Sequence, residues 1–143
     1  MKKVLLAAVV MVASLTSMGV ARTGTPEPAR FRVVDVWIDA GSPVAAWQVE
    51  VRTIAGDATM VGVEGGEGPF ADPAYYDPRA LTGGRIVLAA FTTGEPLPAG
   101  HHRIARLHLR EVGGAAEQNA RLVVAAGVEG ESIKATVSLG GDR

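Results

Sequence analysis

Residues 45–53, Ala45-Ala46-Trp47-Gln48-Val49-Glu50-Val51-Arg52-Thr53, decide the fold class. Large apolar side chains alternate with polar ones along this stretch, in the order Trp47, Gln48, Val49, Glu50, Val51 and Arg52. Successive side chains of a β-strand leave opposite faces of the sheet, so a period of two predicts a strand with one buried face. We therefore expect Trp47 to lie in the core.

Similar patterns along the rest of the chain predict further strands. Near the N-terminus, Val34, Val36 and Ile38 share one face and Asp35 and Trp37 the other. The expected strands are residues 31–38, 45–53, 59–63, 85–91, 102–112, 121–128 and 133–139. The chain has 18 glycines and 8 prolines, many of them in the turns between these segments. At least seven short strands joined by turns predict an all-β, jelly-roll-like antiparallel β-sandwich.

The N-terminal residues 1–21 have the layout of a secretory signal peptide. Lys2 and Lys3 precede an apolar run of about a dozen residues, and small residues lead to Ala21, after which we expect cleavage. The run is shorter than the ~20 apolar residues of a membrane-spanning helix. We expect an exported, periplasmic or extracellular protein that does not span the membrane once processed, with a linker over 22–29 and one domain over 30–143.

Composition excludes several classes of function. Without Lys2 and Lys3, twelve Lys and Arg residues face fifteen Asp and Glu residues, a net charge of −3. This balance lacks the basic patch of a nucleic-acid-binding protein, so we expect no nucleic-acid partner. There is no cysteine, and 48% of the residues are apolar, so stability rests on apolar burial and not on disulfides.

The connection over residues 64–84 is too long for a simple turn. Long loops in compact domains are usually functional or held down by their own side chains. Asp77 before Pro78 has the chemistry of a helix N-cap and first helical position, and Gly83 is suited to end a turn, so we expect one short helical turn there.

Aromatic residues are the best candidates for a binding site. Three of the seven aromatics of the chain, Phe70, Tyr75 and Tyr76, fall in the 64–84 connection. The two tyrosines either stack on a ligand such as a sugar ring or pin the loop to the sandwich. Trp37, on the polar face of its strand, is either covered by a second layer or exposed as a platform. The candidate binding residues are Trp37, Phe70, Tyr75 and Tyr76.

Metal binding and cofactors are not expected. On one strand, His102 and His108 would share a face about 20 Å apart and His101 would face the other way, too far for ligands that lie about 2 Å from one zinc ion. Asp72 and Asp77, with nearby glutamates, either give oxygens to calcium or act as turn and cap residues; their spacing matches no calcium loop.

Catalysis is likewise not expected. The chain has no cysteine nucleophile and no Gly-x-Ser-x-Gly elbow. Paired carboxylates meet only in the folded protein, so a small carboxylate-based hydrolase stands as a third alternative.

Three segments together resemble cohesin domains, a branch of the jelly-roll sandwiches related to cellulose-binding modules. Val44 to Val51 resembles an early cohesin strand, Gly84 to Phe91 the strand after the variable loop, and Leu97 to Leu109 the following turn and strand. The resemblance lies in order and spacing over most of residues 31–140. Cohesins usually belong to large scaffold proteins, and residues 69–81 with their paired tyrosines match no feature of the family.

The resemblance implies a binding role, because cohesins hold dockerin modules and their relatives hold polysaccharide. We therefore expect a non-catalytic module that binds another exported protein. The alternative is a carbohydrate-binding module that uses Trp37, Tyr75 or Tyr76 on a polysaccharide.

Overall fold

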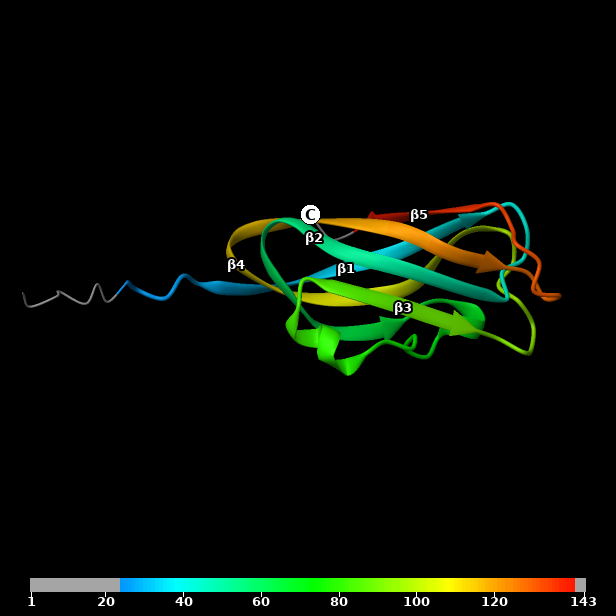
Figure 1. Cartoon of the computed structure of the whole chain (residues 1–143), viewed down its shortest axis with the longest axis horizontal. Coiled ribbons are helices and arrows are strands. Elements are labelled where there is room, and N and C mark those ends of the chain that lie inside the picture. The colour runs from blue at the N-terminus through cyan, green and yellow to red at the C-terminus, as the bar shows by residue number, and fades with distance from the viewer. Residues whose placement is uncertain (1–23, 141–143) are drawn as a thin grey trace, which may run out of the picture.

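The computed structural model describes residues 24–140, which form one antiparallel sheet with the strand order β3-β2-β4-β1-β5 (Figure 1). The strands are β1 (Ala29–Ala40), β2 (Ala46–Gly65), β3 (Arg85–Phe91), β4 (Gly100–Ala126) and β5 (Ala135–Gly140). Two short 3-10 helices, η1 (Gly68–Phe70) and η2 (Pro78–Thr82), lie between β2 and β3. No helix of the described range is long and apolar enough to cross a membrane. The expected signal peptide, residues 1–21, lies outside the described residues.

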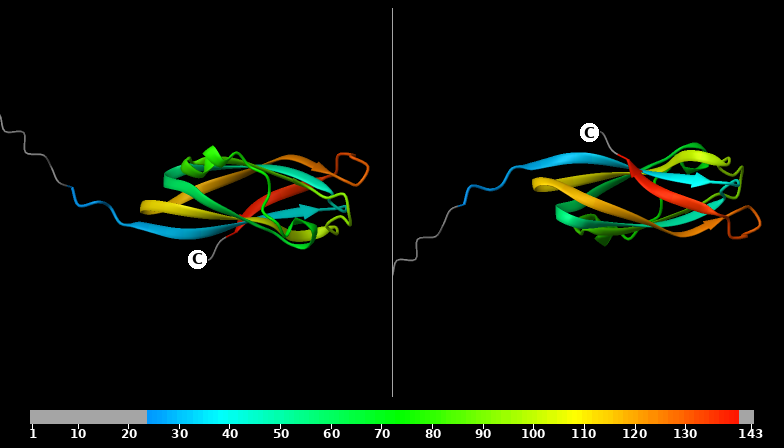
Figure 2. Two further views of the ribbon diagram at one scale, coloured as in Figure 1. Left: turned by 90° about the horizontal axis from the view of Figure 1, so that it is seen from below. Right: turned by 90° about the horizontal axis from the view of Figure 1, so that it is seen from above.

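The long strands β2 and β4 bend together, and this folds the sheet into a two-layer sandwich (Figure 2). Residues 46–55 of β2 pair with 117–126 of β4, whereas residues 57–65 pair with 105–112. β3 pairs with the first of these β2 segments, and β1 pairs with residues 100–112 of β4. We call residues 46–53, 85–91 and 117–126 the three-stranded layer, and residues 29–40, 57–65, 100–112 and 135–140 the four-stranded layer.

Glycine makes the bend possible. Gly56 has a φ of 78°, and a Cβ atom at this position would lie 2.8 Å from the Cα of Ala116. Gly113 and Gly114, on the facing turn of β4, have φ values of 76° and 149°. Residues other than glycine rarely adopt these angles. Glycine at these positions therefore lets both strands bend while their backbones stay close.

The all-β antiparallel sandwich predicted from the sequence is confirmed, but the number of strands was wrong. Residues 45–53 and 59–63 were expected as two strands, but residues 46–53 and 59–63 both lie in β2. Likewise, 102–112 and 121–128 were expected as two strands, and β4 covers both up to Ala126. Each pair is one strand because the ladder between β2 and β4 resumes directly after the bend.

The core lies between the layers and follows the alternation seen in the sequence. The predicted inward residues of β1 and β2 are buried: Val34, Val36, Ile38, Trp47, Val49 and Val51. The same core cluster includes the inner residues Leu107 and Leu109 of β4, next to β1, and Ile86 and Leu88 of β3, next to β2. Trp47 is 2% exposed, which confirms its predicted place in the core.

The connection between β2 and β3 follows the surface of the sandwich. The predicted helical turn is confirmed as η2, where the Asp77 side chain accepts a hydrogen bond from the Arg79 amide at 3.0 Å and Gly83 is the C-cap. Before it, η1 places Phe70 in the core. The loop is therefore packed down at several points along its length.

Candidate binding surface

The structure separates the four aromatic residues that the sequence offered as candidates. Phe70 is 2% exposed, and its ring lies edge-on to Trp47 with 5.9 Å between the ring centroids. Phe70 is therefore a core residue and offers no surface to a ligand. Tyr76 is half-buried against the same core. The role of pinning the loop belongs to these two residues.

Trp37 lies on the outer face of the four-stranded layer, whereas Tyr75 bridges Ala89 of β3 in the three-stranded layer. Its ring stacks on the imidazole of His101, with a centroid distance of 4.9 Å and an angle of 5° between the planes. The indole is half-buried, and His101 covers one of its faces. Trp37 therefore does not join the tyrosines in one site.

Tyr75 is the candidate that stands exposed, beside the edge of the three-stranded layer. Its backbone pairs with Ala89 of β3 through two hydrogen bonds, 2.8 and 3.0 Å long. This short bridge aligns the Tyr75 ring with that of Phe91, at a centroid distance of 6.3 Å and 13° between the planes. Tyr75 is 72% and Phe91 63% exposed, so two nearly parallel rings project into solvent.

The two rings border an apolar groove on the outer face of the three-stranded layer. The groove has a volume of about 340 Å³ and is lined by residues of β2, β3 and β4, including Ala46, Ala89 and Val124. Val123, Val124 and Val128 add exposed aliphatic surface at and beyond the end of β4. We call Ala46, Tyr75, Ala89, Phe91 and Val124 the apolar patch. Monomeric domains expose few large apolar patches, and such patches often mark interaction sites.

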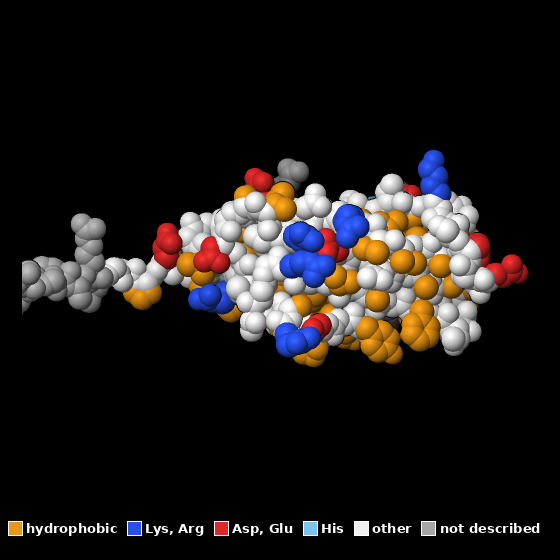
Figure 3. All heavy atoms as spheres, viewed as in Figure 1, with side chains coloured by type: hydrophobic (Ala, Val, Ile, Leu, Met, Phe, Trp, Pro, Cys, Tyr) orange, Lys and Arg blue, Asp and Glu red, His pale blue; other side chains and the backbone are white. Residues whose placement is uncertain are grey.

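An arginine cluster lies beside the apolar patch on the same face (Figure 3). Glu50 of β2 is 4% exposed and receives hydrogen bonds from Arg52 at 2.7 Å and from Arg85 at 2.8 Å. Arg121 of β4 completes the cluster at 3.6 Å. One carboxylate therefore holds three guanidinium groups, which leaves the cluster with a net positive charge.

The arginines keep Glu50 ionised. The hydrogen bond from Arg52 is the largest influence, and together with Arg85 it outweighs the effect of burial, so the pKa of Glu50 falls from 4.5 to about 2. A carboxylate bound in this way remains charged at any physiological pH, so the cluster is a permanent feature of the surface.

Sequence analysis did not identify Phe91, Val124 or the arginine cluster. The signal was present: Glu50, Arg52 and Gln48 share the outer face of β2, and any strand paired with β2 contributes its own outward residues to that face. The sequence alone did not show which strands pair with β2, or in which register. Residues 85–91 and 121–128 read as apolar strands, and only the register places Arg85 and Arg121 beside Glu50.

The three histidines each face a separate carboxylate. His108 Nε2 lies 2.7 Å from Glu64, His102 Nδ1 lies 3.2 Å from Glu67, and His101 Nδ1 lies 3.8 Å from Asp39. The expectation that His102 and His108 share a face was wrong. A β-bulge between Val36 and Trp37 leaves Ile104 unpaired and shifts the alternation of β4, so His101 joins His108 on the outer face.

The acidic residues offered for calcium do not converge. Asp77 is bonded to Arg79, whose hydrogen bonds are the largest cause of the lowered pKa of the Asp77 carboxyl. Across residues 24–140, no group of three or more His, Cys, Asp or Glu side chains is placed to hold a metal ion.

Comparisons of this chain with models of protein families, with curated proteins and with solved structures found no match. The candidate site therefore rests on the residues and geometry described above.

Proposed function

We propose that this protein is an exported, non-catalytic, cohesin-like binding module that holds another exported protein on the outer face of its three-stranded layer. The observation that carries the proposal is the apolar patch with its two exposed parallel rings, Tyr75 and Phe91, next to the arginine cluster. Protein interfaces are enriched in aromatic residues and arginine, and commonly combine an apolar centre with a polar rim.

The charge of the cluster indicates the chemistry of the partner. Arg52, Arg85 and Arg121 share one carboxylate, so part of their hydrogen-bonding capacity remains for a second acidic group. Arginine binds carboxylates through two parallel N–H donors, a geometry that gives specificity as well as affinity. A partner that presents an apolar surface flanked by Asp or Glu fits this face.

Two features of the sequence support the compartment and the class. The pattern of residues 1–21 predicts export. The segments that resemble cohesins include residues 44–51 and 84–91, which contribute β2 and β3 to this face. The proposal thus joins a resemblance in the sequence to a surface seen in the structure.

The decisive experiment is a capture assay with three forms of residues 22–143. The bait is the wild type, a Tyr75→Ser/Phe91→Ser double variant, or a Phe31→Ser control, and the prey is the organism's own exported fraction, read by mass spectrometry. Phe31 is 74% exposed but lies on β1 in the other layer, so Phe31→Ser removes an exposed aromatic ring without touching the patch.

We expect the wild type and the Phe31→Ser control to retain one stoichiometric protein. The double variant should bind it at least roughly tenfold more weakly, the effect of removing central aromatic contacts from an interface. Equal retention by all three forms, or no specific retention by any, would contradict the proposal.

Carbohydrate binding is the second candidate, and one observation favours it. Exposed, nearly parallel rings such as Tyr75 and Phe91 offer flat apolar surface on which the C–H face of a sugar can stack. The test is electrophoresis through native gels that contain hydroxyethyl cellulose or xylan. Retarded migration that the double variant abolishes would support this candidate over the protein partner, whereas unchanged migration would rule it out for these glycans.

A further inference from the structure

The sandwich is open along one seam. Residues 117–126 of β4 form one edge of the three-stranded layer, and β5 forms one edge of the four-stranded layer. The two edges meet at the loop between them, where Ala126 bridges Ser132 and the Ile133 amide bonds to Ala125 at 3.0 Å. Beyond this point the described residues form no ladder between β4 and β5, and Figure 2 shows the two strands diverging.

The backbone of β4 points hydrogen-bonding groups into this seam. The Thr53 amide of β2 bonds to Gly84, on the side away from β4, so the facing pair Thr53 and Gln118 exchanges no hydrogen bonds. In an antiparallel ladder, bonded and non-bonded pairs alternate. The same alternation leaves Ala120 and Leu122 unbonded to β2, so the amides and carbonyls of these residues and of Gln118 face outward. Outside the strand ladders, the backbone hydrogen bonds of residues 24–140 include none that uses these groups.

The core is incompletely covered along the same seam. Most inner residues of the central strands are buried, whereas most of those on the two seam strands are only partly buried. The partly buried residues on these edges are Ala120 and Leu122 of β4, Ala135, Val137 and Leu139 of β5, and Ile133 just before β5.

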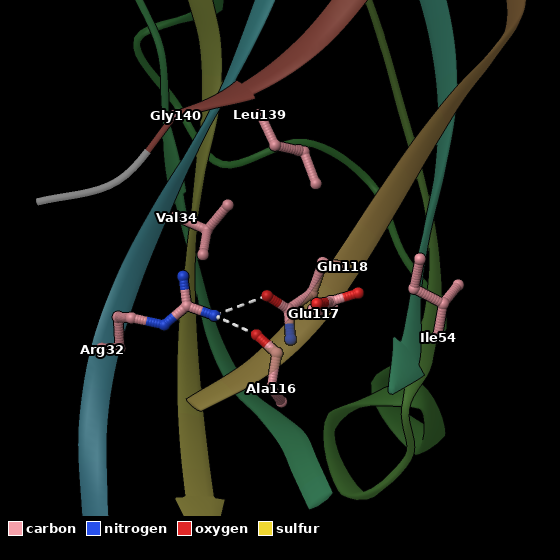
Figure 4. A pocket seen from close by; sticks show the side chains of 8 residues that line it. All are labelled: Arg32, Val34, Ile54, Ala116, Glu117, Gln118, Leu139 and Gly140. Carbon is pink, nitrogen blue, oxygen red and sulfur yellow. Dashed lines mark hydrogen bonds between the residues drawn. The ribbon is translucent and has the colours of Figure 1, made fainter. Parts of the chain in front are cut away.

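Two hollows flank the open edge of β4. One, of about 380 Å³, lies beside residues 122–126 and includes Ile133. The other, of about 320 Å³, lies near the bend, between Val34, Leu139 and Gln118 (Figure 4). Together they border the edge at both of its ends.

Contacts of Arg32 and of the buried Glu111 fix the end of the seam near the bend. Arg32 of β1 reaches across the hollow in Figure 4 and donates to the carbonyl of Ala116 at 3.0 Å and to Gln118 Oε1 at 2.5 Å. Its Nε donates to Glu111, which is fully buried and also accepts from the Ala116 amide at 2.9 Å. These contacts hold the bend of β4 against β1, so the start of the open edge has a defined position.

We propose that the seam is a strand-addition site, where an extended segment of a partner polypeptide pairs with residues 117–124 of β4. Its backbone takes the hydrogen bonds of Gln118, Ala120 and Leu122, and apolar side chains at every second position cover Leu122 and Leu139. The partner segment is thus an alternating apolar and polar strand without proline. This site uses the backbone edge of β4 and not Tyr75 or Phe91, so it can be tested separately from the function proposed above.

The N-terminal arm of a second copy is a poor occupant. Residues 24–28, Gly-Thr-Pro-Glu-Pro, extend away from the sandwich (Figure 1). These residues carry no large aliphatic or aromatic side chain that could cover Leu122 and Leu139 at every second position. The chemistry of the edge therefore favours a segment of a different polypeptide.

The test uses a phage-displayed library of random dodecapeptides selected on purified residues 22–143. Ala120→Pro removes the central outward amide and no hydrogen bond to β2, while Ala120→Ser keeps that amide at nearly the same size. We expect selected peptides with alternating apolar residues, which bind Ala120→Ser like the wild type and Ala120→Pro at least roughly tenfold more weakly, a loss of the size that follows when hydrogen bonds at an interface are removed.

Amide exchange read by NMR gives a sharper signature and does not depend on the variants folding. Peptide binding should slow exchange at Gln118, Ala120 and Leu122 and leave Asn119 and Arg121, which already face β2, unchanged. The Tyr75→Ser/Phe91→Ser variant should bind the same peptides, which separates this site from the sheet-face site.

Three results would overturn the proposal. They are a failure to select any binding peptide, peptides that protect other amides, and protection of the edge that grows with protein concentration alone. The last result would assign the seam to a second copy of this chain.

Discussion

The outer faces of the two layers differ in how their charged and apolar side chains are partnered. On the four-stranded layer, charged groups pair across neighbouring strands: Arg106 binds Asp35 at 2.7 Å, and His108 binds Glu64 at 2.7 Å. Trp37 is covered on one side by His101. On the three-stranded layer, the charges gather around Glu50 and leave apolar residues on the rest of the face without such partners.

This difference shows where the domain has surface left to bind with. On the four-stranded layer, many charged groups already have partners in the same layer, and the Trp37 indole is covered by His101. The apolar patch is exposed to water. Contact with another molecule would remove its apolar area from water, which stabilises the complex by about 25 cal/mol per Å². The two faces share one core and one bend. Substitutions on one face can therefore be compared with substitutions on the other as controls.

The largest expected effect comes from detaching the loop that supplies Tyr75. Phe70→Ala removes a buried ring packed on Trp47, and we expect it to lower the free energy of unfolding by about 3 to 5 kcal/mol. Tyr75→Ala, five residues later but on the surface, should cost less than about 1 kcal/mol. Urea unfolding of both variants measures the difference. Similar losses for the two residues would contradict their assignment to core and surface.

The contrast between Phe70 and Tyr75 also shows what the sequence could and could not predict. Both are aromatic residues of one irregular connection, where no period of two sorts side chains into inner and outer sets. In the regular strands that period was sufficient: Trp47 was placed in the core, and the limits of β3, Arg85–Phe91, were predicted correctly. Asp77 and Pro78 gave a helix start with a known chemistry, so η2 was predicted as well.

Features that depend on pairing between distant segments were missed. The alternation of β4 reverses at Ile104, because an extra residue is accommodated against β1, and this put His102 on the wrong face. The continuity of β2 through Gly56 was missed for a similar reason, since glycine marks a turn in the sequence whether or not the ladder resumes after it. The arginine cluster joins three strands, so only the register brings it together.

A smaller effect is expected at the arginine cluster, and it depends on pH. The pKa of Glu50 is lowered from 4.5 to about 2 by its arginine partners, so the folded state favours the carboxylate. This contribution to stability is fully present above about pH 4.5 and is lost as the pH falls toward 2. Glu50→Gln should therefore lower stability at pH 7 and flatten the decline between these two values.

Urea unfolding at a series of pH values between 2 and 7 measures this change. The control is Glu117→Gln, an exposed carboxyl on β4 in the same layer, which should keep the wild-type profile. If Glu50→Gln and the wild type decline in parallel across this range, the arginines do not stabilise the ionised form of Glu50.

The smallest effect should come from the opposite face. His108 and Glu64 are a partly exposed pair on the four-stranded layer, with side-chain exposures of 36% and 55%. Exposed ion pairs contribute little, because water and salt screen them, so Glu64→Gln should change the free energy of unfolding by less than about 1 kcal/mol. It should also leave retention of the captured partner unchanged, since Glu64 lies in the layer that does not carry the patch. Loss of the partner in Glu64→Gln would place the binding surface on the four-stranded layer and reverse the comparison between the faces.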